Sequence, residues 1–173
     1  MKQEYLDSIG KNISSRLSLR KPQVKSLEIL SNLISNIKLD KNRNVNDILK
    51  EIIELYPSVE SFEREFPSVC FALATGVGKT RLMGAFISYL FLKGVSRHYF
   101  ILAPNLTIYQ KLKEDFNPKN EKYVFKGMQE IVSNEPEIIT GEDYDTGRGV
   151  RNENLPKGSQ TTIYNNESRI FIN

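Results

Sequence analysis

One segment, residues 73–80 with the sequence LATGVGKT, constrains the fold of this chain more than any other. Apolar residues 69–73 precede it and a largely apolar stretch follows it, so the pattern predicts a loop between a strand and a helix. Gly76 and Gly78 permit backbone conformations that side chains forbid, which lets successive N–H groups turn toward an anion at a helix N-terminus. The segment is therefore predicted to be a phosphate-binding loop.

The residue types of this loop suit the phosphate chain of a nucleotide. Lys79 is placed to reach the β- and γ-phosphates of ATP, and Thr80 to take one ligand position on a phosphate-bound Mg²⁺. We therefore predict both as catalytic residues, with Thr80 also as the metal ligand. The predicted ATP-binding residues of the loop are Thr75, Gly76, Val77, Gly78, Lys79, Thr80 and Arg81. Leu73 stands where the usual pattern has Gly or Ala, so a chance Gly-Lys-Thr in an ordinary loop is the alternative.

Composition places the chain among ordinary soluble globular proteins. Hydrophobic residues make up 39% and charged residues 26% of its 173 residues, unlike a disordered chain. The net charge of +3 permits nucleic-acid binding without arguing for it. No apolar run approaches the length of a membrane span, so no membrane partner is expected. The single cysteine, Cys70, is expected to be a small buried hydrophobe, and the lack of any internal disulfide fits a cytoplasmic location.

The chain divides into a helical first third and an α/β remainder. The predicted helices, placed by apolar residues at helical spacing, cover residues 5–17, 24–37, 46–55 and 79–92. The last of these is apolar on nearly every face, so we expect it to be buried. From residue 67 onward short apolar strands alternate with helices, which is typical of a parallel sheet with crossover helices. The predicted strands cover residues 69–73, 99–103, 137–140 and 169–173.

Three segments resemble a known family. Residues 71–87, FALATGVGKTRLMGAFI, are similar to the first helicase motif of the restriction (Res) subunits of type III restriction enzymes, within the DEAD/DEAH-like superfamily 2 ATPases. Residues 101–112, ILAPNLTIYQKL, resemble the next motif, called Ia. Residues 19–23, LRKPQ, resemble the segment whose glutamine recognises adenine. The resemblance covers most of the chain between residues 18 and 116.

This resemblance implies a fold, ligands, partners and further site residues. The implied fold is an α/β P-loop NTPase with a RecA-like three-layer parallel sheet over residues 67–173, preceded by a helical region over residues 1–66. Gln23 is implied to recognise adenine, and Asn105 and Thr107 of motif Ia to contact nucleic acid. The implied ligands are ATP and Mg²⁺. The implied partners are double-stranded DNA, the remainder of the Res polypeptide and a modification methyltransferase.

One part of a superfamily 2 motor has no match in this sequence. Such motors carry an Asp-Glu pair that holds the water shell of Mg²⁺ and orients the attacking water. Glu142 and Asp143 follow a weak apolar stretch, but their order and spacing differ, so we expect them to lie in a solvated loop. The chain is therefore expected to be the N-terminal piece of a longer protein, truncated before the Walker B strand and without ATPase activity of its own.

Several of these assignments have ordinary alternatives. Gln23 also fits an exposed polar residue at a helix start, and Asn105 fits the N-cap of a helix after Pro104. Tyr123 and Phe125, interleaved with lysines, suit base stacking but more often are core residues on an amphipathic helix. We expect the ATP-binding part of a DNA translocase of a restriction endonuclease. A non-catalytic nucleotide-dependent DNA-binding module and a P-loop phosphotransferase are the alternatives.

Overall fold

The computed structural model describes residues 6–40, 42–145 and 169–172. The chain forms two compact units, Met1–Leu82 and Met83–Asn173. The phosphate loop over residues 73–80 belongs to the first unit. In the part of the chain that the structure describes, no helix combines the length and the apolar character needed to span a membrane.

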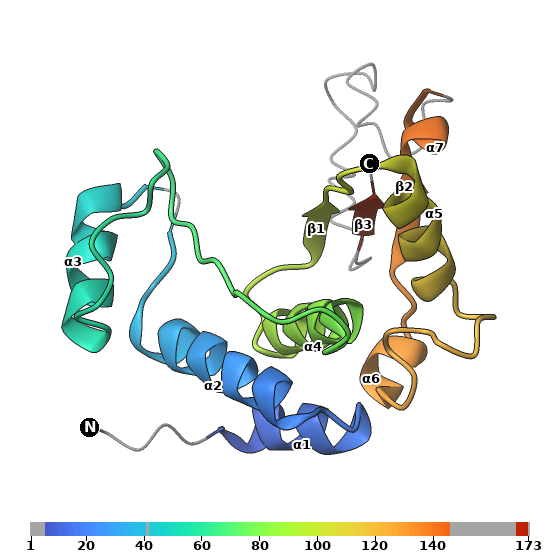
Figure 1. Cartoon of the computed structure of the whole chain (residues 1–173), viewed down its shortest axis with the longest axis horizontal. Helices are drawn as coiled ribbons and strands as arrows, with labels where there is room; N and C mark the ends of the chain where they lie inside the picture. The colour runs from blue at the N-terminus through green and yellow to red at the C-terminus, as the bar shows by residue number, and fades with distance from the viewer. Residues whose placement is uncertain (1–5, 41, 146–168, 173) are drawn as a thin grey trace, which may run out of the picture. The chain divides into compact units, whose positions relative to one another are not determined.

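The first unit begins with three helices: α1 (Ser8–Arg16), α2 (Lys21–Asn36) and α3 (Val45–Leu55) (Figure 1). The predictions of helices over residues 24–37 and 46–55 are confirmed, and the helix predicted over 5–17 is confirmed within the described residues. Side-chain N-caps fix the first residues of α1 and α3. Asp7 accepts a hydrogen bond from the Gly10 N–H at 2.8 Å, and Asn44 accepts one from the Asn46 N–H at 2.8 Å.

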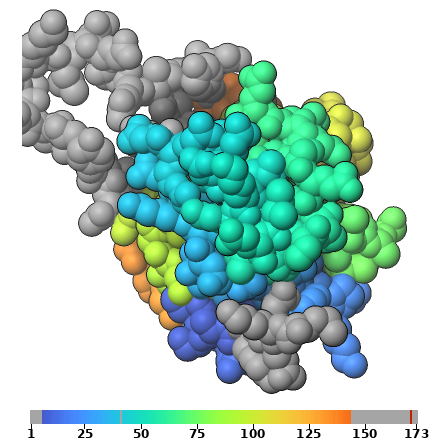
Figure 2. Space-filling view, turned by 90° about the vertical axis from the view of Figure 1, so that its left-hand side faces the viewer, coloured from blue at the N-terminus to red at the C-terminus, as the bar shows by residue number. Residues whose placement is uncertain are grey.

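α2 and α3 share a small hydrophobic core. Its buried residues come from the second half of α2, from α3 and from the segment that follows: Leu33, Ile37, Ile48, Ile52 and Phe62. The surface that α3 and the following segment present is coloured cyan to green in Figure 2. These helices are therefore held by packing of their apolar faces, which supplies most of the stability of short helices.

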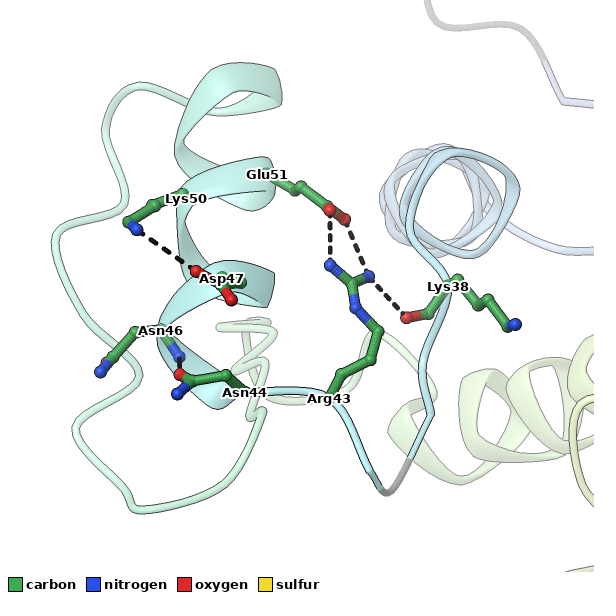
Figure 3. Close-up of polar contacts among 7 residues, drawn as sticks. All are labelled: Lys38, Arg43, Asn44, Asn46, Asp47, Lys50 and Glu51. Carbon is green, nitrogen blue, oxygen red and sulfur yellow. Dashed lines mark hydrogen bonds and ion pairs between the residues drawn. The ribbon is translucent and has the colours of Figure 1, made fainter.

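A forked ion pair fixes the loop between α2 and α3 (Figure 3). The guanidinium of Arg43 donates to the two carboxylate oxygens of Glu51 at 2.5 and 3.1 Å. The same guanidinium also donates to the Lys38 carbonyl at 2.9 Å. The hydrogen bond from Arg43 lowers the pKa of Glu51 below its ordinary value. Because two parallel N–H groups donate to one carboxylate, the pair fixes the orientation of Arg43 in the loop in addition to its electrostatic attraction.

The apolar stretch before the phosphate loop is not a strand, so the prediction for residues 69–73 is wrong. Residues 67–74 have no regular secondary structure, and Val69 is 52% exposed. Cys70 is exposed as well, so the prediction that it is a buried hydrophobe is also wrong. An apolar sequence becomes a strand only by pairing, and this stretch pairs with no strand among the described residues.

The second unit contains a parallel sheet of three strands: β1 (His98–Ile101), β2 (Glu137–Thr140) and β3 (Arg169–Ile172). β3 lies between the other two and pairs in parallel with both, with Tyr99 opposite Ile170 and Ile138 opposite Ile170 (Figure 1). The prediction of a parallel sheet is confirmed for three of the four predicted strands. The helices after the phosphate loop are α4 (Lys79–Leu92), α5 (Leu106–Asp115), α6 (Gln129–Val132) and α7 (Gly141–Asp145).

The turns between α5 and α6 pack into the core of the second unit. Tyr123 and Phe125 are 7% and 0% exposed, and Phe125 meets Phe116 edge to face with ring centroids 5.6 Å apart. Base stacking by these rings is therefore not supported, because both are core residues. They lie on turns, not on the expected amphipathic helix. The prediction that α4 is buried is confirmed, since Ala85 and Tyr89 are both 0% exposed.

Candidate phosphate-binding site

The phosphate loop leads directly into α4. Gly76 and Gly78 adopt φ angles of +79° and +94°, in the left-handed region that other residues rarely enter. The helix begins at Lys79, immediately after the second of these glycines, and runs for 14 residues. The predicted passage from a glycine-rich loop into a helix is therefore confirmed.

The end of the loop presents backbone donors without protein acceptors. Among the residues that the structure describes, the N–H groups of Val77, Gly78, Lys79 and Thr80 make no hydrogen bond. The first N–H groups of an α-helix have no acceptor within the helix and carry the positive end of its dipole. Successive N–H groups at a left-handed bend form a concave site for an anion. This part of the loop therefore suits a phosphate group.

The Lys79 side chain folds back over the loop. Its Nζ donates to the Ala74 carbonyl at 3.1 Å, and the side chain is exposed. An ammonium on the surface exchanges one oxygen acceptor for another at little cost, so a phosphate oxygen can take the place of this carbonyl. Thr80 lies in the first turn of α4 and is partly exposed. The loop thus offers N–H donors, an ammonium and a hydroxyl, which together fit a polyphosphate and its Mg²⁺.

Gln23 is buried against this loop. It is 1% exposed, and its Nε2 donates to the Gly78 carbonyl at 2.8 Å. Its Oε1 accepts from the backbone N–H of Arg20 at 2.7 Å, across the first turn of α2. The contact with the loop is close enough that a Cβ on Gly78 would lie 2.9 Å from Nε2. Gln23 is therefore not an ordinary exposed residue at a helix start.

Two arginines add contacts at the same place. Arg20 donates from Nη1 to the Gly76 carbonyl at 3.1 Å. Arg81 donates from Nη1 to the Leu17 carbonyl, at the C-terminal end of α1, at 3.0 Å. The guanidinium of Arg81 thus contacts the end of α1, and its predicted contact with a nucleotide stays a prediction. The sequence did not predict the contact of Arg20 with the loop. The one local indication of it is that Arg20 lies three residues before Gln23, at the N-cap of the same helix.

The predicted DNA-contacting residues lie in the second unit, at the start of α5. Asn105 is the N-cap of this helix, because its Oδ1 accepts from the Ile108 N–H at 3.0 Å. The capping interpretation is therefore confirmed. Thr107 lies exposed in the first turn of α5, so the structure brings both predicted residues to one helix end.

The acidic pair after β2 has local partners. Asp143 accepts from the backbone N–H and the hydroxyl of Thr140 at 2.9 and 2.8 Å. Glu142 accepts from Lys113 at 2.9 Å, and this bond raises the pKa of that lysine. Both acids lie in α7, so the expected loop is wrong at these positions, whereas Glu142 is exposed to solvent as expected. In the described part of the chain no three His, Cys, Asp or Glu side chains are grouped so that they could hold a metal ion.

A comparison with known families agrees with the geometry of the loop. The family described as type III restriction enzyme, res subunit, matches residues 16–172, which include the α1–α2 turn, the phosphate loop and all three strands. Searches among curated proteins and among solved structures find no significant match. A family match over this length implies a P-loop helicase-like fold, in which a glycine-rich loop at the start of a buried helix is the expected nucleotide site. The chain therefore belongs to the res subunit family of type III restriction enzymes.

Proposed function

We propose that the chain is the ATP-binding part of the motor of a type III restriction enzyme. In the complete enzyme, hydrolysis of ATP by this motor drives its action on double-stranded DNA. The family match supports a helicase-like ATPase domain. The observation that carries the nucleotide-binding part is the row of N–H donors from Val77 to Thr80 beside the exposed Lys79 ammonium.

Each residue of the loop has a part in this proposal. The N–H groups of Val77, Gly78 and Lys79 donate to phosphate oxygens, and the Lys79 ammonium leaves the Ala74 carbonyl for the β- and γ-phosphates. The Thr80 hydroxyl holds Mg²⁺, which neutralises charge on the phosphate chain when it is bound. Apart from Gly76 and its two chain neighbours, no heavy atom of the described residues lies within 4 Å of a Cβ built on Gly76, so the bend has room for a ligand.

The complete three-layer sheet and the binding partners of the chain are also proposals. Three parallel strands support a RecA-like three-layer sheet in the complete domain. Exposed Thr107 and the N–H groups at the start of α5 are suited to a DNA phosphate. The remainder of the Res polypeptide and a modification methyltransferase complete the proposed assembly, which we place in the cytoplasm.

Recognition of adenine by Gln23 stays a prediction. Both polar atoms of its side chain already have partners in the structure. Nε2 keeps a second N–H donor and Oε1 a second lone pair, which match the one acceptor and one donor of the adenine edge, but the base must reach them on a side chain that is 1% exposed. Competition between ATP and GTP tests this role, since a preference for ATP that narrows in Gln23→Ala supports it. Equal binding of the two nucleotides by the unmodified chain removes it.

A second function, nucleotide-dependent DNA binding without catalysis, is favoured by one observation. Glu142 and Asp143 are engaged with Lys113 and Thr140, so these acids stabilise local structure and are poor candidates for activating a water. The two functions differ in turnover. Release of phosphate from ATP by the 173-residue chain, lost in Lys79→Ala, contradicts the binding-only function, whereas its absence is the outcome that we expect for this chain under both functions.

The nucleotide site is tested by equilibrium binding of Mg²⁺–ATP to the unmodified chain and to Lys79→Ala. Loss of a charge-assisted contact of about 1.5–3 kcal/mol predicts a fall in affinity of roughly tenfold to a hundredfold. Lys50→Ala is the matched control, because it removes another exposed lysine, whose one ion pair within the described residues is with Asp47 on α3. Unchanged affinity in Lys79→Ala, with an unchanged circular dichroism spectrum, contradicts the proposal.

A further inference from the structure

Two backbone carbonyls of the phosphate loop accept hydrogen bonds from side chains. The Gly76 carbonyl accepts from the Arg20 guanidinium at 3.1 Å, and the Gly78 carbonyl accepts from the Gln23 amide at 2.8 Å. The Gly78 carbonyl also accepts from the Leu82 N–H at 3.1 Å, as the first bond of α4. All of these residues lie in the first unit. Two carbonyls of the loop are thus held from the start of α2, by its N-cap Arg20 and by Gln23 in its first turn.

Holding a carbonyl also orients the next N–H group. The peptide group is planar and trans, so the C=O of one residue and the N–H of the next point in opposite directions. Because Arg20 holds the Gly76 carbonyl, the Val77 N–H is directed to the opposite side of the loop. Gln23 fixes the Lys79 N–H in the same way through the Gly78 carbonyl. Both N–H groups belong to the row that has no protein acceptor among the described residues.

The two contacts are linked to each other and to a fixed turn. Gln23 accepts from the backbone N–H of Arg20 at 2.7 Å, so each residue steadies the other. The turn that carries them is tied back by Arg81, which donates to the Leu17 carbonyl at 3.0 Å. Gly78 needs its small size here, because its φ of +94° and the Cβ contact of 2.9 Å with Gln23 both disfavour a side chain.

We propose that Arg20 and Gln23 are positioning residues of the phosphate loop, which aim the Val77 and Lys79 N–H groups at the phosphates. This inference rests on the proposed function, since it concerns the same site. It differs from base recognition in what it requires of the ligand. A residue that shapes the loop affects any polyphosphate, whereas a residue that reads adenine affects only ligands that carry adenine.

The first test uses tripolyphosphate, which has no base, beside ATP and GTP. Arg20 is exposed, so Arg20→Met is expected to fold normally. We expect it to weaken binding of all three ligands by about threefold to tenfold, the loss of one hydrogen bond. Arg20→Lys keeps one donor on a long side chain and is expected to restore part of the affinity. Lys21→Met removes a neighbouring exposed charge and is the control, expected to stay within about twofold.

Gln23→Met gives the second arm, because methionine fills a similar volume without polar atoms. We expect equal losses for tripolyphosphate, ATP and GTP, with the ratio of ATP to GTP affinity unchanged. A loss confined to ATP means that Gln23 reads the base and overturns its positioning role. Circular dichroism confirms folding, and Arg20→Met keeps the proposal testable if Gln23→Met does not fold.

Amide NMR spectra of the ligand-free chain separate positioning from direct contact. If Arg20 orients the loop, Arg20→Met shifts the Val77 amide signal before any ligand is added. An unchanged Val77 signal together with weaker tripolyphosphate binding means that Arg20 contacts the phosphate itself, which overturns the proposal. If the unmodified chain binds neither ATP nor tripolyphosphate, the proposed function fails as well. Normal binding in both variants overturns the positioning roles alone.

Discussion

Replacing Gly84 with alanine tests how closely α4 packs in the second unit. In the middle of a helix this change usually stabilises a protein, because alanine has the higher helix propensity. Here we expect the opposite, a loss of stability. A Cβ on Gly84 would lie 2.8 Å from the Val124 carbonyl oxygen and 2.9 Å from the Val124 Cβ, whereas ordinary contacts lie at 3.4–4 Å.

The magnitude follows from which atoms must move. Neither contact is made by the far end of a flexible side chain, so the Val124 backbone itself must retreat by about half an ångström. Val124 lies between the buried rings of Tyr123 and Phe125, which resist that movement. Overpacking costs about 1–3 kcal/mol, and a clash with backbone atoms belongs to the upper part of that range, about 2–3 kcal/mol. Helix propensity returns about 1 kcal/mol, so the expected net loss is about 1–2 kcal/mol.

Urea denaturation followed by circular dichroism measures this loss. With a slope of about 2 kcal/mol per molar urea, the middle of the usual range, the midpoint is expected to fall by about 0.5–1 M in Gly84→Ala. Ser35→Ala on the exposed face of α2 is the control for propensity alone and is expected to raise the midpoint slightly. A Gly84→Ala chain as stable as the unmodified one, or more stable, refutes the close packing of α4 on this segment.

Four further outcomes are expected. The bond to Arg43 lowers the pKa of Glu51 below its ordinary value of 4.5. The pair therefore stabilises the fold above pH 4.5, and this stabilisation is lost as the pH falls through the lowered pKa of Glu51. In Arg43→Met, a carbon-detected NMR titration should show that the pKa of Glu51 has risen. Asn105→Ala removes the cap of α5 and should lower the free energy of unfolding by about 0.5–2 kcal/mol in urea denaturation. DNA binding by the chain, measured by fluorescence anisotropy, should be weak, indifferent to sequence and steeply reduced by salt, and binding that survives high salt contradicts this. Phosphate release from ATP by the chain should be negligible with saturating Mg²⁺ and DNA. Lys79-dependent turnover at about 1 s⁻¹ or faster, an ordinary enzyme rate, contradicts this expectation.

Local patterns in the sequence predicted most of the helices. The apolar spacing over residues 24–37 and 46–55 matches α2 and α3 because one face of each helix packs on the same small core. The glycines of the phosphate loop were also predictable, since their left-handed conformations exclude most other residues. The strand predicted over residues 137–140 has the same bounds as β2.

Features that depend on distant pairing were harder to predict. The stretch over residues 69–73 has the composition of a strand but pairs with none among the described residues, so Cys70 is exposed. β1 begins one residue earlier than predicted and ends at Ile101, where its pairing with β3 ends. The contact between Arg20 and Gly76 joins residues 56 positions apart, which no local pattern reveals. The resemblance of residues 19–23 to an adenine-recognition segment pointed to Gln23, whereas only the structure shows its burial against Gly78.

We propose that the loop over residues 73–80 holds the phosphates of a nucleotide through its backbone N–H groups. Amide NMR of the 173-residue chain during titration with Mg²⁺–ATP measures this directly, because each N–H reports its own hydrogen bond. We expect the largest shifts at Val77, Gly78, Lys79 and Thr80, and no saturable shifts at these positions in Lys79→Ala at the same ATP concentrations. If ATP binds while these four signals stay unchanged, the loop does not hold the phosphates through its N–H groups.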